Sequence, residues 1–235
     1  MSSWAPKRFW QLAEAAPCEG GFSVVLDGKT VRTPAKTPLV VPSLALAQEI
    51  AAEWQAQQGK VRPETMPFTR TANSALDKVA TQFEEVAGLI AAYGASDLLC
   101  YRAEHPATLV GRQAKGWDPV LDWAAQTLGA PLTVTAGVVP VAQPPASVAV
   151  CAAHVRALTP FQLAAFHDLV AISGSLILGF AVARGQMTAE QAWDLSRIDE
   201  FWQAEQWGGD DDATKSENVR RQGLLHAGRF FALCG

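Results

Sequence analysis

Motifs for metal and nucleotide binding are lacking in this 235-residue sequence. It contains neither the phosphate loop G-x-x-x-x-G-K-[ST] nor a G-x-G-x-x-G segment after a predicted strand, so nucleotide binding has no motif support. Its four cysteines, at positions 18, 100, 151 and 234, include no C-x-x-C pair. This spacing indicates neither a zinc site nor a disulfide framework, and it fits a reducing compartment. We therefore predict no metal and no cofactor.

Long apolar runs and a strong excess of one charge are absent too. The longest apolar run, residues 169–183, is shorter than the roughly 20 residues that cross a bilayer, so we predict a buried helix and no stable membrane insertion. The first ten residues, MSSWAPKRFW, have no apolar core and do not read as a secretory signal. The net charge of −4 argues against a general binder of nucleic acid or anionic membranes.

A catalytic constellation is also missing. The four histidines, at positions 105, 154, 167 and 226, are isolated, and His167 and Asp168 are expected to point about 100° apart on a helix and form no common ligand set. Asp118 and Asp122 lie one helical turn apart, but Asp118 before Pro119 is typical of a helix start. We predict that the protein is not an enzyme, with a carboxylate-based enzyme on a helical scaffold as one alternative.

Small residues interrupt the apolar run. The Ser173-Gly174-Ser175 triplet lacks the flanking pattern of a nucleophile elbow, and we expect it in the middle of a helix. Together with Gly179, the small residues would let neighbouring helices approach closely.

A block of short strands followed by a block of helices is what the sequence does contain. Strands are predicted over residues 22–26, 29–33 and 38–41, with Asp27-Gly28 as a two-residue hairpin turn. Apolar residues at helical spacing predict helices over residues 44–58, 71–93, 118–128, 146–157, 160–184, 189–207 and 216–234. We interpret residues 129–145 as either a short extended segment or a linker. The predicted fold class is α+β, mostly helical: a small antiparallel β domain followed by a larger helical bundle.

The N-terminal segment carries a basic–aromatic cluster, Lys7, Arg8, Phe9 and Trp10, whose aromatic rings we expect to dock onto the domain.

An acidic–aromatic stretch occupies residues 188–212. Thr188 and Gln191 have the spacing of a capping box. At helical pitch Asp199 lies beside an apolar stripe, and Glu200 points to the face that carries Trp193 and Trp207. One interpretation is structural, with Asp199 paired inside the fold; the other is a contact surface for a protein partner, since aromatic residues are enriched at interfaces. The predicted partner-binding residues are Asp199, Glu200, Trp202, Glu205, Trp207 and Asp210.

The sequence resembles a known family through an ordered set of short blocks. They are LDGK at 26–29, RTPAK at 32–36, AQEIAAEW at 47–54, PETMPFTRTAN at 63–73, DLLCYRA at 97–103, WDPVLDW at 117–123, SGSLIL at 173–178 and the region of Glu200 to Asp210. These blocks, with Gln57, Asp77 and Gln113 between them, resemble the assembly chaperones for the α subunit of the ATP synthase catalytic head. The resemblance spans nearly the whole chain.

This resemblance implies a non-enzymatic chaperone of two domains, which we place at residues 1–68 and 69–235, with 130–142 as a candidate addition to the first. It would hold the newly made α subunit until the β subunit arrives. The resemblance also implies that an acidic residue upstream of Trp207-Gly208, either Asp199 or Glu200, matters for function. With no organelle-targeting extension visible, we expect a bacterial, cytoplasmic protein that is monomeric when free.

Two further alternatives stay open from the residues. A generic holdase would bind many unfolded proteins through a diffuse apolar patch. A membrane-associated helical protein would use residues 161–183.

Overall fold

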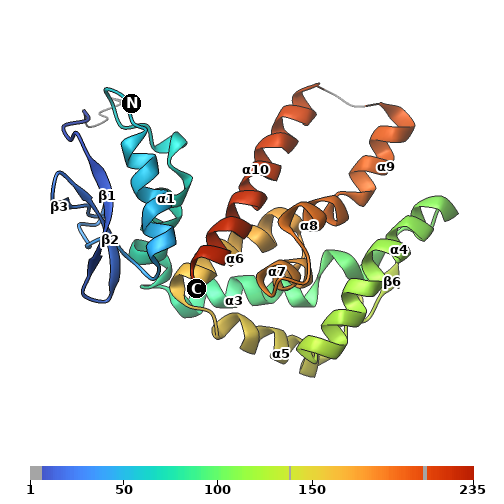
Figure 1. The fold of residues 1–235 in the computed structure, drawn as a ribbon. Coiled ribbons are helices and arrows are strands. Elements are labelled where there is room, and N and C mark those ends of the chain that lie inside the picture. Colours follow the sequence, from blue (N-terminus) through green and yellow to red (C-terminus); the bar gives the residue numbers. More distant parts are fainter. Residues whose placement is uncertain (1–6, 138, 209–210) are drawn as a thin grey trace. The chain divides into compact units, whose positions relative to one another are not determined.

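The computed structural model describes residues 7–137, 139–208 and 211–235, and for residues 211–213 only the backbone (Figure 1). Contacts between Cα atoms divide the chain into two compact units. The first holds the chain up to Phe83 together with Thr159–Ala165 and Arg229–Gly235, and the second holds Glu84–Leu158 and Phe166–Gly228.

An antiparallel sheet of four short strands forms one layer of the first unit. Strand β2 (Gly21–Leu26) pairs with β1 (Ala13–Cys18), β3 (Lys29–Thr30) and β4 (Val40–Val41). The predicted hairpin turn is confirmed, since both turn residues have positive φ, 48° at Asp27 and 81° at Gly28. Strand β1 was not predicted, because its sequence AEAAPC is rich in alanine and contains a proline, both rare in strands.

Helix α1 packs against this sheet, and α2 packs against α1 (Figure 1). Helix α1 (Leu44–Gln55) begins, as predicted, after Ser43, whose side chain accepts a hydrogen bond from the Leu46 amide. Helix α2 (Pro67–Ser74) is capped from α1: the Glu53 carboxylate accepts hydrogen bonds from the amides of Phe68 and Thr69 at 2.6 and 2.7 Å. The largest buried side chains of this core include Trp10, Leu39, Leu46, Ile50, Met66 and Phe230.

The single helix predicted over residues 71–93 is wrong, because the backbone is interrupted. A π-helical turn over Ala75–Val79 follows α2, and α3 (Phe83–Ala91) begins only after a break. At that break the Thr81 hydroxyl donates to the Lys78 carbonyl at 2.8 Å, so a side chain competes with the helical ladder.

The second unit is built mainly from helices. They are α3, α4 (Ala107–Trp123), α5 (Pro145–Arg156), most of α6 (Pro160–Ser173), α7 (Leu176–Ala183), α8 (Ala189–Ser196), α9 (Ile198–Trp207) and most of α10 (Asp211–Leu233). Strand β6 (Thr135–Ala136), from the segment predicted as extended or linker, pairs in parallel with β5 (Tyr101–Arg102). The predicted class, α+β and mostly helical with a small antiparallel sheet at the N-terminal side, is confirmed.

The predicted helix start at Asp118-Pro119 is wrong. Pro119 lies inside α4, which begins eleven residues before Asp118, at Ala107. A proline in a helix interior forfeits one backbone hydrogen bond, but here the same turn buries Trp117, Val120 and Leu121. The Asp118 carboxylate does not cap a helix; it pairs with Arg102 at 2.8 Å.

The Ser-Gly-Ser triplet separates two helices, so its predicted place in the middle of one helix is wrong. Gly174 has φ +75°, which ends α6, and the Ser175 side chain caps α7 by accepting from the Leu178 amide. The buried Asp97 carboxylate accepts from the Ser175 hydroxyl at 2.8 Å and from the Ile177 amide at 3.0 Å. The expected close helix approach is found at Gly179, where a Cβ would lie 2.8 Å from a methyl group of Val170.

None of the described helices has both the length and the apolar character needed to cross a membrane.

Candidate functional site

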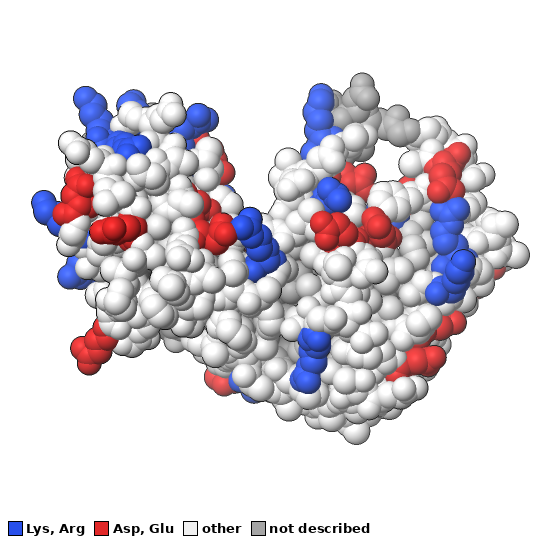
Figure 2. Space-filling view, viewed as in Figure 1, with Lys and Arg blue, Asp and Glu red and all other residues white. Residues whose placement is uncertain are grey.

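The acidic–aromatic stretch folds as two helices rather than one. Thr188 and Gln191 form the predicted capping box at the start of α8. Arg197 then leaves the helical conformation (φ −115°, ψ 17°), which ends α8 and begins α9. In Figure 2 acidic side chains lie over the α8–α9 part of the surface, with Lys and Arg side chains beside them.

Helix α4 supports α9 through side chains that face it. Gln113 donates a hydrogen bond to Asp199 of α9, and Arg112 donates to Glu205 of the same helix. Gly116 leaves room for the junction, since a Cβ there would lie 3.0 Å or less from side-chain atoms of Leu195 and Ile198. The position of α9 therefore depends on polar contacts and on a glycine that permits close approach.

Asp199 is half-buried and hydrogen-bonded within the fold. The Gln113 amide nitrogen donates to its Oδ1 atom at 2.6 Å. Burial raises the pKa of the Asp199 carboxyl above its ordinary 3.8; the hydrogen bond from Gln113 opposes this shift and the nearby charge of Glu200 adds to it.

Glu200 is exposed and paired with a buried cation. Its Oε1 atom lies 2.5 Å from a terminal nitrogen of Arg197, whose other terminal nitrogen donates to the Ile172 carbonyl at 2.6 Å. The Arg197 guanidinium also stacks over the Trp193 ring, 5.0 Å from its centroid. Glu200 thus balances a charge that is otherwise surrounded by protein.

The predicted common face of Glu200, Trp193 and Trp207 is wrong. Trp193 is only 2% exposed, and the backbone change at Arg197 places it in a different helix from the other two. Trp207, in contrast, is 75% exposed, and its ring meets the half-buried Trp202 edge to face at 5.7 Å.

Glu205 completes the described part of the surface. Both of its carboxylate oxygens accept from Arg112 at 2.8 Å, and this pairing lowers the pKa of Glu205 and raises the pKa of Arg112. Asp210, the remaining predicted site residue, lies outside the described residues. Asp199, Glu200, Trp202, Glu205 and Trp207 all lie on α9.

Two cations of this surface were not predicted as site residues. The i,i+3 spacing of Arg197 and Glu200 is a local signal for a helical ion pair and could have been used. Arg112 is 93 residues from Glu205, so no local pattern reveals that pair.

The chemistry of an active site is not visible around these groups. Among the described residues no cluster of three or more His, Cys, Asp or Glu side chains could hold a metal ion. Burial raises the pKa of the Cys100 and Cys151 thiols to about 12 and about 11, so neither is poised as a nucleophile. The Nδ1 atom of His167 lies 2.9 Å from Oδ1 of Asp168, so the prediction that these side chains point apart is wrong. Both side chains are exposed.

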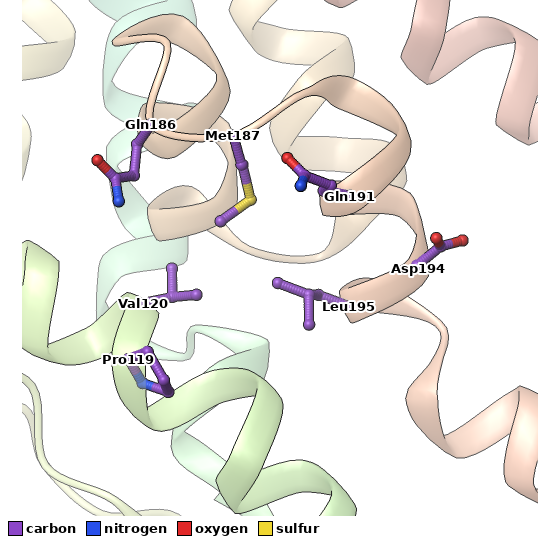
Figure 3. A pocket seen from close by; sticks show the side chains of 7 residues that line it. All are labelled: Pro119, Val120, Gln186, Met187, Gln191, Asp194 and Leu195. Atoms are coloured by element: carbon purple, nitrogen blue, oxygen red, sulfur yellow. The ribbon is translucent and has the colours of Figure 1, made fainter.

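A pocket of about 400 Å³ lies beside this surface, between α4, α8 and the turn before α8 (Figure 3). It is lined by Pro119, Val120, Gln186, Met187, Gln191, Asp194 and Leu195.

Comparison with known proteins decides the family. The ATP12 chaperone protein family matches residues 7–125, just over half of the chain. The chain belongs to the ATP12 chaperone family. A fission yeast (Schizosaccharomyces pombe) relative, the mitochondrial protein atp12, is 25% identical over 240 residues, covering 97% of this chain and 82% of the relative.

Solved structures agree with membership of the ATP12 chaperone family. Atp12 from Paracoccus denitrificans is 50% identical with a TM-score of 0.95, covering 97% of this chain and 98% of that one. A chaperone candidate from Agrobacterium tumefaciens is 44% identical with a TM-score of 0.93, covering 98% and 87%. The predictions of the family, of a chaperone for ATP synthase assembly and of a protein that is not an enzyme are confirmed by these relatives.

Proposed function

We propose that this ATP12 family chaperone binds the unassembled α subunit of the ATP synthase catalytic head, covers its β-facing surface and releases it to the β subunit. The proposal rests on the family membership and on the resemblance of ordered blocks along nearly the whole chain. We place its action in the bacterial cytoplasm, as a monomer when free.

The observation that carries the proposal is the exposed Trp207 on the acidic helix α9. Trp207 is 75% exposed and leaves a large apolar ring in water, and tryptophan is enriched at protein–protein contact sites. On the same helix, Asp199, Glu200 and Glu205 supply negative charge. An aromatic centre with a polar rim is the usual composition of a protein–protein interface.

The task of such a chaperone is to protect a subunit that has not yet been assembled. A ring subunit without its neighbours exposes an apolar interface that would otherwise aggregate. A chaperone that covers this interface must bind with limited affinity, because the true partner has to displace it. Glu200 and Glu205 are already paired with arginines of the chaperone, so these two carboxylates add little new electrostatic attraction, which suits moderate affinity.

An aggregation assay with isolated subunits tests the proposal. The α and β subunits are diluted separately from denaturant, with and without the chaperone, and light scattering is followed. We expect suppression of α aggregation only, reversed when native β subunit is added. Equal protection of both subunits would indicate a generic holdase, and protection of neither would contradict the proposed client.

A further inference from the structure

The pocket between α4 and α8 has an apolar floor. The buried Val120 forms part of it, and the side chains of Met187 and Leu195 converge on Val120 above Pro119 (Figure 3). Its volume of about 400 Å³ falls within the range of pockets that enclose small ligands, so it can hold an aromatic or long aliphatic side chain. Methionine adapts its shape to different apolar partners, which suits such a site.

The rim of this pocket is polar. Of the residues that line the pocket, only Asp194 is charged, and its charge is negative. Gln186, Gln191 and Asp194 are exposed, and the lining includes no lysine or arginine. Within the part of the chain that the structure describes, the Asp194 carboxylate makes no ion pair. Glu190, one turn earlier on α8, is likewise exposed and unpaired there. The rim is therefore complementary to a cation.

The pocket continues the α9 surface along α4. Arg112 and Gln113 contact α9, the next turn of α4 supports Leu195, and Pro119 and Val120 line the pocket. Eight residues of helix separate Arg112 from Val120, a distance of about 12 Å. An extended segment of four or five residues spans this distance, so one bound segment can reach both places.

We propose that the pocket binds one apolar side chain of the client polypeptide, from a segment in which a lysine or arginine follows closely and pairs with Asp194. This inference rests on the proposed function and adds a second contact to it. The pocket supplies shape-dependent recognition of a single side chain, and the α9 surface supplies the carboxylates and Trp207.

Filling the pocket tests the inference. Met187→Trp places an indole over the floor, and Gln82→Trp adds the same group at an exposed position in the first unit as a matched control. The affinity of each variant for isolated α subunit is measured by biolayer interferometry, with circular dichroism and Tm as folding controls. We expect at least a tenfold loss of affinity for Met187→Trp and none for Gln82→Trp.

Two surface changes keep the inference testable if Met187→Trp fails to fold. Asp194→Lys should weaken α binding, and the loss should shrink as salt is raised. A photo-crosslinking residue at position 186 should attach to the α subunit beside an apolar residue that neighbours a lysine or arginine.

The possible outcomes separate this inference from the proposed function. If wild type binds the α subunit and a folded Met187→Trp variant binds it equally well, the pocket is not a client contact. If wild type does not bind the α subunit, the proposed function fails first. If Met187→Trp instead dissolves a wild-type dimer seen by sedimentation, the occupant is a second copy of the chain, and the inference is overturned.

Discussion

Gln113 joins Asp199 to the segment that follows strand β5. Its amide oxygen accepts from the Ala103 backbone amide at 2.8 Å, so its nitrogen must face the Asp199 carboxylate, to which it donates at 2.6 Å. Gln113 itself is buried. The orientation of Asp199 is therefore set by a group that has only one way to satisfy its own hydrogen bonds.

Asp199→Asn is expected to weaken client protection while the fold persists. An asparagine oxygen can still accept from Gln113, so we expect the free energy of unfolding to change by no more than about 1 kcal/mol. The negative charge offered to the client is lost. Urea unfolding and the α-subunit aggregation assay measure the two effects separately, and unchanged protection by the folded variant would remove Asp199 from the contact surface.

Glu200→Ala is expected to act mainly on stability. It leaves the buried Arg197 guanidinium without its carboxylate, and because Glu200 itself is exposed we expect a loss of about 1–2 kcal/mol rather than the larger cost of a fully buried pair. Glu205→Ala serves as the control, since both members of its pair with Arg112 are exposed and its unfolding curve should match wild type. A Glu200→Ala curve that also matches wild type would show that Arg197 needs no partner.

Local patterns predicted those features of the site that depend on neighbouring residues. The capping box at Thr188 and Gln191, the hairpin turn at Asp27-Gly28 and the helix end before Gly208 each arise within a few residues. The grouping of acidic and aromatic residues on one segment was also visible, because consecutive residues stay together in any fold.

Long-range contacts explain what the sequence could not predict. Trp193 and Trp207 looked equivalent by spacing, but Trp193 is buried beneath Arg197 and Trp207 is exposed, a difference that follows from the break at Arg197. Pro119 reads locally as a helix start, yet tertiary packing of α4 overrides that preference. The pocket requires α4 and α8 to come together, which no local pattern specifies.

Gly179→Ala is expected to destabilise the second unit. The added methyl would lie 2.8 Å from Val170 Cγ2 and about 3.2 Å from the Phe166 ring, and neither a β-branched side chain nor a buried ring can easily move aside. Overpacking of this kind costs about 1–3 kcal/mol, more than the roughly 0.5–1 kcal/mol gained from alanine in a helix. Thermal unfolding should show a lower Tm than for Gly88→Ala, where no atom lies within 4 Å of the new methyl. Equal Tm values would mean that α6 and α7 can separate without cost.

The pH dependence of stability should report the environment of Asp199. Burial raises its pKa in the folded protein above the ordinary 3.8, so the folded state binds its proton more tightly than the unfolded state does. The stability gained from this proton is fully present below about pH 3.8 and is lost as the pH rises through the folded-state pKa. Relative to Asp199→Asn, wild type should therefore gain free energy of unfolding as the pH is lowered from 7 to 4. Urea unfolding of both proteins across this range measures the difference, and a difference that moves the other way would mean that the hydrogen bond from Gln113 outweighs burial.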